Sequence, residues 1–444
     1  MMRIPLVVVC LSALWVGCGG PEPLATLALD ESDRRFANSP RADAQQTVDD
    51  ILKKEALALE DVLVIADLIS PQLAVERKNI DLSTAEIWEA RLYPNPSIVL
   101  QVQDYATRGG SFSSASRTAG VHVPVVISGR IGAATSLAEK KREVAAFQYV
   151  WKRRQLLTDV KKAFVSVLAA QRLSELMREN RDLAKTLHDV TNERFKAEAI
   201  PEMELLKAAV QLAKAESDLK LTEKDLMVSV KTLHALMGNI DFPKDKFAGD
   251  LHTRFTTPSL ESLRGQVTTV HPLLEAAARN REAAELQLSL AKAERIPDLG
   301  VEFAGGKDTN DEGILEGGIE IPLPIFNRNQ AKISVSETLI RQAELQAQAV
   351  RNDLILQLTA TYREFSAAQD RVAVYKDEIL PKAQKALDQT NEGRKLGKFS
   401  YLDVLDAQRT LAEARIAYAA ALNDLNQSAA DLEFITGTKL EPIR

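Results

Sequence analysis

Hydrophobic residues recur at helical spacing over unusually long stretches of this chain. Between Gly129 and Glu193 there is no proline, and apolar positions follow one another three or four residues apart. A helix of that length extends over about 100 Å at 1.5 Å per residue. Such a helix needs neighbours along its whole surface. Further helices are expected at residues 47–91 (broken near Pro71), 202–237, 272–295 and 329–392.

Four short segments alternate instead between aliphatic and polar or small residues. In the first, Ile98, Leu100 and Val102 point one way, and the residues between them point the other. The other three centre on Val123, Val301 and Ile321. Strands of about 8–10 residues can cross a hydrocarbon layer when tilted, with aliphatic residues toward lipid and polar residues toward water. The alternative is a small soluble β-subdomain that caps a helical bundle.

Four strands do not close a barrel, and open sheet edges are not tolerated in lipid. Closure therefore needs strands from several chains, and three chains would supply about twelve, which is within the size range of water-filled barrels. The lipid-facing interpretation of the strands thus predicts an oligomer.

The same order of predicted elements occurs twice along the chain. Residues 123–130 (VPVVISGR) correspond to residues 321–328 (IPLPIFNR), and Glu139 to Glu337, about 200 positions apart. Residues 197–201 likewise correspond to 396–400. We therefore expect a mainly α fold with a small β part, in which a helix, β-hairpin, long helix and helix unit is duplicated. The first repeat covers residues 51–238, a connector 239–258, and the second repeat 259–438.

The N-terminus has the pattern of a targeting segment. Residues 1–17 contain an early Arg3, an apolar run and Gly17, which predicts a signal peptide. Cys18 then resembles the lipidated first residue of a bacterial lipoprotein; the alternative is an ordinary signal cut near Gly20. Residues 18–50, rich in Pro, Asp, Arg, Ser and Gln, predict a lipid-anchored extended tether.

Composition and charge mainly exclude classes of function. The net charge is -6, so nucleic acid is not an expected partner, and aromatic residues make up only 5%. There is no nucleophile motif, phosphate loop or paired cysteine, so we expect neither an enzyme nor a cofactor. His122, on the predicted polar strand face, could bind a metal, but a solvated polar residue is the plainer interpretation. The other histidines show no ligand spacing, so no metal site is predicted; they are His188, His234, His252 and His271.

These features together resemble the TolC outer membrane efflux protein family. The resemblance is carried by the duplicated organisation, by residues 93–96 (YPNP) and by residues 397–406 (GKFSYLDVLD), and it covers about residues 50–440. It implies a homotrimer with a twelve-stranded β-barrel in the outer membrane, continuous with a twelve-helix α-barrel in the periplasm. It further implies a passive exit channel that works with a periplasmic adaptor (membrane fusion) protein and an inner-membrane pump, for small toxic solutes such as metal cations or drugs. The lipoprotein-like start is common in its drug-efflux and heavy-metal (CzcC/CusC-like) branches.

The resemblance assigns roles to the turns between the long and short helices. Acidic residues that match Asp403 and Asp406 line the closed periplasmic aperture in the family, and threefold symmetry would make them cation-selective carboxylate rings. Crowded like charges raise such pKa values, and a helix N-terminus opposes that shift. The first repeat has Glu204 in place of Asp403 but Lys207 in place of Asp406. The alternative for Asp403 is purely structural, since Ser400 and Asp403 have the spacing of a helix capping box.

The same turns are the implied adaptor contacts, and a simple hairpin turn is the alternative. Glu198 stands where the second turn has Gly397, and without glycine a left-handed turn residue is more costly. We therefore expect the first turn to close differently. The contact residues are Ala197, Glu198, Ala199, Ile200, Pro201, Leu396, Gly397, Lys398, Phe399 and Ser400.

Two other kinds of protein remain possible. A periplasmic adaptor or structural helical-hairpin lipoprotein also uses a long hairpin, but it carries one copy between β-rich halves. A protein-secretion exit duct would share the channel design. A duct that only encloses its cargo does not need to encode the cargo's identity, so the sequence leaves the cargo open.

Overall fold

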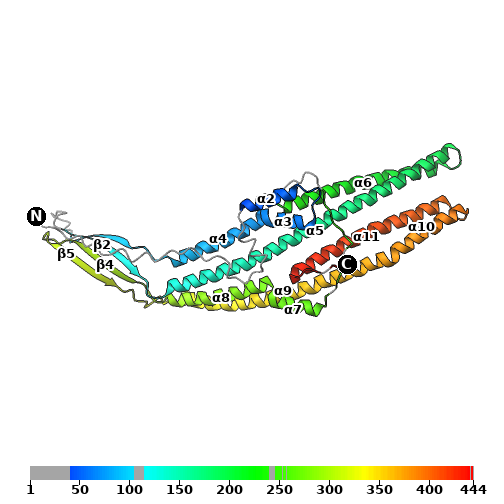
Figure 1. Ribbon diagram of the computed structural model, residues 1–444. Helices are drawn as coiled ribbons and strands as arrows, with labels where there is room; N and C mark the ends of the chain where they lie inside the picture. The colour runs from blue at the N-terminus through cyan, green and yellow to red at the C-terminus, as the bar shows by residue number, and fades with distance from the viewer. Residues whose placement is uncertain are drawn as a thin grey trace. The chain divides into compact units, whose positions relative to one another are not determined.

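The structure is a computed structural model that describes residues 41–104, 115–239, 246–252, 254–256, 258–440 and 442–443. The predicted signal peptide and Cys18 lie outside these residues. The chain divides into two compact units (Figure 1). One contains residues 79–143 and 279–341, and the other contains residues 38–78, 144–278 and 342–444. The first unit holds the sheet, and the second holds the helix tips.

The first half of the chain forms five helices. They are α2 (Arg41–Leu52), α3 (Leu59–Ile69), α4 (Pro71–Arg91), α5 (Arg130–Lys196) and α6 (Glu202–Leu236). The predicted break at Pro71 is confirmed, but the break after Leu52 was not predicted. Residues 41–50, expected in the extended tether, are helical in α2, so that part of the prediction is wrong. The side chain of Val48 is fully buried, and this packing stabilises α2.

Two shorter helices, α4 and α6, lie alongside the long helix α5. α5 is 67 residues long and uninterrupted. Arg77 of α4 donates to the Tyr149 hydroxyl at 3.1 Å, and Arg178 of α5 pairs with Glu223 of α6 at 3.2 Å. At the end of α6, a Cβ atom at Gly238 would lie 3.2 Å from the carbonyl oxygen of Ile69, just before α4. The two shorter helices therefore meet end to end beside α5.

The second half repeats the plan with one interruption. It forms α7 (Leu260–Val270), α8 (Pro272–Ala293), α9 (Gln330–Val374), the π-helical turn η4 (Tyr375–Ile379), α10 (Leu380–Lys395) and α11 (Tyr401–Thr436). The expected single helix of residues 329–392 is thus interrupted by a π-turn that ends two residues before Pro381. Proline has no N–H group and its ring clashes with the preceding helical turn, and the wider π-turn accommodates it.

The alignment of the two repeats needs one correction. Gly129, with φ +70°, precedes α5, and Asn329, with φ +58°, precedes α9. Their carbonyls accept equivalent hydrogen bonds, from Ala133 and Ile333, each at about the same length (3.1 and 3.0 Å). Gly129 therefore corresponds to Asn329 and not to Asn327. Asparagine is the residue besides glycine that most readily takes the left-handed conformation, which explains why the sequence pattern hides the match.

The core of the helical unit is built from α7, α9 and α11. Phe365 of α9 is fully buried, and it packs with aliphatic residues of both neighbours. Such side chains contribute about 1.5–3 kcal/mol each when fully buried. The cluster includes Leu263, Val267, Leu354, Leu358, Leu425 and Leu432. None of the helices within the described ranges is both long and apolar enough to cross a membrane.

The four main strands form one antiparallel sheet in the order β1-β2-β4-β5. They are β1 (Ser97–Gln103), β2 (Ser116–Val125), β4 (Leu299–Lys307) and β5 (Gly313–Glu320). The hairpins of the two repeats are joined through β2 and β4, whose register pairs Val121 with Phe303. The strands β3 (Arg254–Phe255) and β6 (Pro442–Ile443) form a separate small pair.

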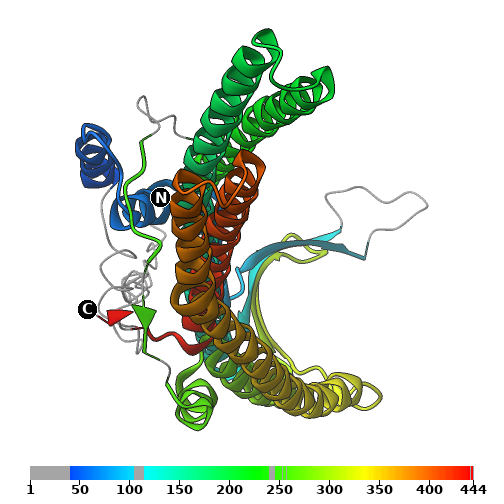
Figure 2. The ribbon, with the colours of Figure 1, turned by 90° about the vertical axis from the view of Figure 1, so that its right-hand side faces the viewer.

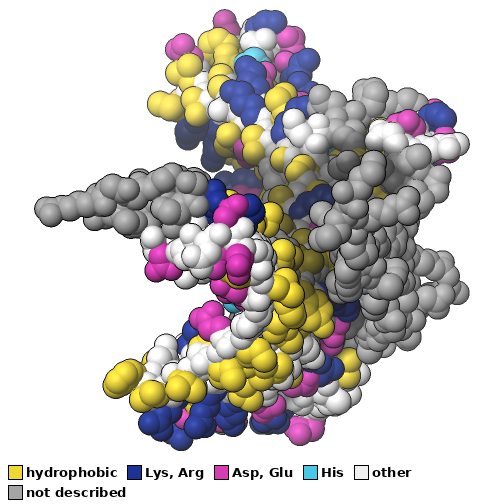
Figure 3. Space-filling view, turned by 90° about the vertical axis from the view of Figure 1, so that its left-hand side faces the viewer, with side chains coloured by type: hydrophobic (Ala, Val, Ile, Leu, Met, Phe, Trp, Pro, Cys, Tyr) yellow, Lys and Arg dark blue, Asp and Glu magenta, His cyan; other side chains and the backbone are white. Residues whose placement is uncertain are grey.

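The register gives the sheet one aliphatic and one polar face. Ile98, Val121 and Phe303 are directly paired and all exposed, and hydrophobic side chains gather on the surface seen in Figure 3. The opposite face carries His122 paired with Glu302. The predicted alternation is therefore confirmed, and β1 and β5 are left as edges among the described strands.

Candidate functional site

The helix tips are the ends of two helical hairpins (Figure 2). At the first tip, between α5 and α6, the Ala199 N–H donates to the carbonyl of Arg194 at 2.9 Å, and the Glu198 N–H donates to Phe195 at 2.8 Å. This is the Schellman pattern, which satisfies the last carbonyls of a helix. It requires a left-handed residue, and Glu198 has φ +55°.

The second tip, between α10 and α11, closes in the same way. The Lys398 N–H donates to Gly393 at 2.8 Å and the Gly397 N–H donates to Arg394 at 3.0 Å, with Gly397 at φ +72°. The expectation that the first tip closes differently is therefore wrong. Glu198 adopts the glycine-like conformation because the two satisfied carbonyls outweigh a cost of about 1–2 kcal/mol.

The two tips differ in how the next helix begins. Ser400 is the N-cap of α11: its hydroxyl accepts from the Asp403 N–H at 3.2 Å, and the Asp403 carboxylate accepts from the Ser400 N–H at 2.7 Å. The predicted capping box is confirmed. In the first repeat Pro201 is the N-cap of α6 and has no side chain that accepts a bond, so Glu204 has no capping partner there.

The capping box also fixes the charge of Asp403. Hydrogen bonds from Ser400 hold the pKa of the Asp403 carboxyl below its ordinary value. The cause is stabilisation of the charged form by donors at a helix N-terminus, which is the opposing effect expected above. Within one chain, therefore, the carboxylate is ionised at neutral pH.

Asp406 forms an ion pair that the sequence analysis did not predict. The Arg409 Nη2 donates to Asp406 Oδ1 at 3.0 Å, and Arg409 Nε lies 3.6 Å from Glu413. The two partners stand three residues apart on α11, a spacing that brings side chains together on a helix. Sequence reasoning missed Arg409, although its spacing from Asp406 was the available signal.

Apolar side chains surround both tips. Phe399 lies over Gly393, where an added Cβ atom would come within 2.3 Å of the ring. Leu396 is 71% exposed, and Leu402 is 63% exposed. On the first hairpin, Met203 and Leu206 are also exposed. Sequence reasoning had not singled out Leu402, Met203 or Leu206; exposed apolar residues so concentrated indicate a contact surface.

The remaining candidate, His122, lies on β2. Its imidazole fits over Gly300, where a Cβ atom would come 2.5 Å from the ring. Within the part of the chain that the structure describes, no three His, Cys, Asp or Glu side chains are grouped as metal ligands.

Comparison with known proteins agrees with this architecture. The family model described as "Outer membrane efflux protein" matches residues 63–239 and 263–438. The cobalt-zinc-cadmium resistance protein CzcC of Cupriavidus metallidurans is 30% identical over 382 residues, 86% of this chain and 90% of its own length. The outer membrane protein TolC of Vibrio cholerae is 25% identical over 328 residues, 68% of this chain and 72% of its own.

Solved structures share the fold. The outer membrane protein VceC of Vibrio cholerae superposes with a TM-score of 0.68 at 17% identity, covering 86% of this chain and 97% of its own. CusC gives 0.69 at 14% identity, covering 85% and 91%. The chain belongs to the outer membrane efflux protein family, a family of channel proteins. It is an exit duct of an efflux system, located in the outer membrane and extending into the periplasm.

Proposed function

We propose that three copies of this chain form the channel. The observation that carries this proposal is the four-stranded sheet, with its continuous aliphatic face and its two unpaired edges among the described residues. In lipid, these edges need partner strands, and three sheets give a closed barrel of about twelve strands. The α-hairpins of the three copies would form the periplasmic α-barrel. The two repeats, residues 51–238 and 259–438, would supply equivalent halves of each subunit, joined by residues 239–258.

The N-terminal segment would attach the chain to the membrane. Residues 1–17 would be removed as a signal peptide, and Cys18 would carry the lipid, followed by a short tether that ends at α2. Mass spectrometry of the purified protein tests this assignment: a diacylglyceryl modification on Cys18 is expected. An unmodified N-terminus near residue 20 would contradict it.

The assembly is tested by its behaviour in the outer membrane. Separation of outer membrane proteins on gels without boiling should give a band of trimer size that becomes monomeric only on heating. A monomer that partitions into the aqueous phase would contradict both the barrel and the exit channel.

The α10–α11 tip would form the periplasmic aperture. Asp403, held ionised by its capping box, and Asp406 would each be repeated three times around the axis, with Glu204 contributing from the other hairpin. Rings of carboxylates favour cations. Arg409 would partly neutralise Asp406, because their side chains are paired at 3.0 Å.

Single-channel recordings test the aperture. The wild-type channel should pass cations in preference to anions, and Asp403→Asn should reduce that preference. Arg409→Ala should increase it, because this substitution leaves Asp406 unpaired. Asp424→Asn, on the same helix but in the pair with Arg371, should change nothing. Unchanged selectivity in both Asp403→Asn and Arg409→Ala would exclude this aperture.

The tips would also contact a periplasmic adaptor, which links the channel to an inner-membrane pump. The exposed Leu396, Phe399 and Leu402 support this role, because a partner would cover them. Cysteines at Glu198 and Lys398 should cross-link to the adaptor, while a cysteine at Lys382, 75% exposed on α10, should not. Equal cross-linking from all three positions would contradict docking at the tips.

Divalent metal cations are the cargo we propose. The support is the 30% identity over most of the chain to a protein named for cobalt, zinc and cadmium resistance. Deletion of the gene should lower the concentrations of Co²⁺, Zn²⁺ and Cd²⁺ that stop growth. If sensitivity to organic drugs increased instead, the cargo assignment would be wrong while the exit-duct function would stand.

A further inference from the structure

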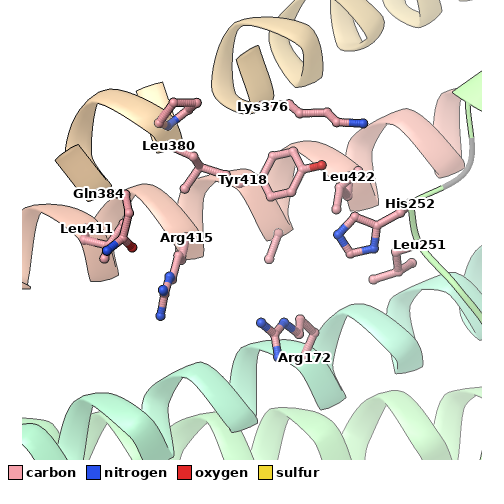
Figure 4. A pocket seen from close by; sticks show the side chains of 12 residues that line it. Arg172, Leu251, His252, Lys376, Leu380, Gln384, Leu411, Arg415, Tyr418 and Leu422 are labelled. Atoms are coloured by element: carbon pink, nitrogen blue, oxygen red, sulfur yellow. The ribbon is translucent and has the colours of Figure 1, made fainter. Parts of the chain in front are cut away.

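A cavity beside the π-turn is lined by positive charges. Its volume is about 550 Å³, and it lies within the helical unit. Arg172 reaches it from α5, Lys376 from η4 and Arg415 from α11 (Figure 4). Among the described residues, its lining contains no aspartate or glutamate. This is unexpected in a chain whose net charge is -6.

The three cations are only partly neutralised. Arg172 Nη1 donates to Glu175 at 2.9 Å, which leaves its other guanidinium N–H groups for further contacts. Arg415 Nη1 is 3.7 Å from Glu179, which is longer than a hydrogen bond. Lys376 forms no ion pair with the residues that the structure describes. In Figure 4 the guanidinium groups of Arg172 and Arg415 extend from opposite helices into the same space.

The rest of the lining is largely apolar. The volume lies within the range of small-molecule sites, in which a few polar groups fix the orientation of a ligand inside an apolar lining. The uncharged polar side chains on the wall are His252, Gln384 and Tyr418, and His252 Nδ1 lies 3.0 Å from Asp250, outside the cavity. The apolar members are Leu251, Leu380, Pro381, Leu411, Ala419 and Leu422.

The π-turn is the element that shapes this wall. The Leu380 N–H bonds to the carbonyl of Tyr375, five residues back, so the turn is wider than an α-helical turn. Leu380, the donor of that bond, and its neighbour Pro381 line the cavity, as does Lys376, which follows the acceptor Tyr375 in the chain. Single π-turns within α-helices occur frequently at functional sites.

Like charges that share a cavity repel one another, and a bound anion removes that repulsion. We propose that this cavity binds an organic anion with one carboxylate or sulfonate group on an apolar body. The anionic group would lie between the guanidinium groups of Arg172 and Arg415, which extend toward the same space in Figure 4, and the body against the leucines. This site is separate from the aperture and does not depend on the proposed cargo.

Calorimetric titration of the full-length channel in phosphatidylcholine nanodiscs tests the proposal, with naphthalene-2-sulfonate as the probe. One probe molecule should bind per chain. The uncharged naphthalene-2-sulfonamide and inorganic sulfate should each bind at least about tenfold more weakly, because each lacks one of the two features that the cavity recognises. If the sulfonate showed no saturable binding, the proposal would be overturned. Equal affinity for sulfate would overturn the part that assigns an apolar body to the ligand.

Substitutions locate the site. Arg172→Ala and Arg415→Ala should each raise the Kd about 10- to 100-fold, the range for loss of one charged hydrogen bond. Arg415→Lys, which keeps the positive charge, should restore part of the affinity. The matched control is Lys382→Ala, which removes a lysine of α10 that pairs with Glu378 and does not line the cavity. If Lys382→Ala weakened binding as much, the attraction would be general and the site would be refuted.

Discussion

At the scale of single residues, a deeply buried ion pair joins α3 to α5. Arg153 donates from Nε and Nη2 to the two carboxylate oxygens of Asp67, both at 2.7 Å. The side chains are only 3% (Asp67) and 11% (Arg153) exposed. Paired guanidinium and carboxylate groups of this geometry are planar and directional, so the pair fixes how α3 lies on the long helix.

Asp67→Ala should lower the free energy of unfolding by about 3–5 kcal/mol, because it leaves the Arg153 charge buried without its partner. Thermal unfolding followed by circular dichroism measures this. The double variant Asp67→Leu/Arg153→Met should lose much less, since it leaves no unpaired charge. Asp424→Ala, which breaks the exposed pair with Arg371, should cost about 0–1 kcal/mol. Equal losses in the two aspartate variants would contradict this account.

His271 makes the stability depend on pH. It lies between α7 and α8, where Nδ1 accepts from the Leu273 N–H at 3.2 Å and the ring contacts the Trp151 ring at a tilt of 57°, with 5.0 Å between the centroids. Burial, and then the charge of Arg154, lower the pKa of His271 to about 4. The folded protein therefore keeps this ring neutral while the unfolded chain protonates it near pH 6.5.

Stability should accordingly fall as the pH decreases from about 6.5 to about 4, by up to about 3 kcal/mol from this residue. His271→Asn keeps a hydrogen-bond acceptor at the helix start but does not titrate. Unfolding measured across that pH range should be flatter for His271→Asn than for the wild type. Parallel curves for the two proteins would show that His271 is not the source.

At the scale of elements, the first helix tip is strained where the second is not. Both use the Schellman closure, but Glu198 occupies a conformation that glycine adopts more easily. Glu198→Gly should therefore stabilise the first hairpin by about 0.5–1 kcal/mol, and Gly397→Ala should destabilise the second by about 1 kcal/mol. Hydrogen exchange of the amides in residues 190–205 and 390–405 measures each hairpin separately. Faster exchange at the first tip in Glu198→Gly would contradict the assignment.

The elements themselves were largely predictable, since their hydrophobic periods are long and regular. The break at Pro71, the helix end at Gly238 and the capping box at Ser400 all depend on local chemistry that the sequence displays. The π-turn before Pro381 was not predicted, because a proline in a helix can be accommodated by a kink, a break or a wider turn, and tertiary packing selects among them.

Long-range pairing was harder to predict than the elements. The sequence indicated two hairpins, but not that β2 and β4 join them into one sheet. The alternation that separates the faces of a strand does not say which strand becomes its neighbour. The equivalence of Gly129 and Asn329 was hidden for another reason: different residues can satisfy the same backbone conformation. The two turns lie where the sequence predicted them. The contact between Arg409 and Asp406 was not predicted, because it depends on the positions of the side chains.

At the scale of the whole molecule, the two faces of the sheet should respond differently to charge. Leu100 is 76% exposed on the aliphatic face, and its neighbour Gln101 lies on the polar face. Leu100→Arg should hinder insertion by about 2–4 kcal/mol per chain, because it places a charge in lipid. Gln101→Arg, one residue away, should be tolerated. The amount of heat-resistant trimer in outer membranes measures both; a loss of trimer in Gln101→Arg alone would reverse the assignment of the faces.

The sheet has two different ends, β1 from the first half of the chain and β5 from the second. Copies that join into a ring must therefore meet head to tail, β5 of one against β1 of the next, with no two identical surfaces in contact. A subunit with an intact β1 and a disrupted β5 can still pair through β1 with one neighbour, but it cannot pair through β5 with the next subunit. One such subunit would leave the barrel of its pore unclosed. In a cell that makes both kinds of chain, the fraction of pores lost would therefore exceed the fraction of altered chains.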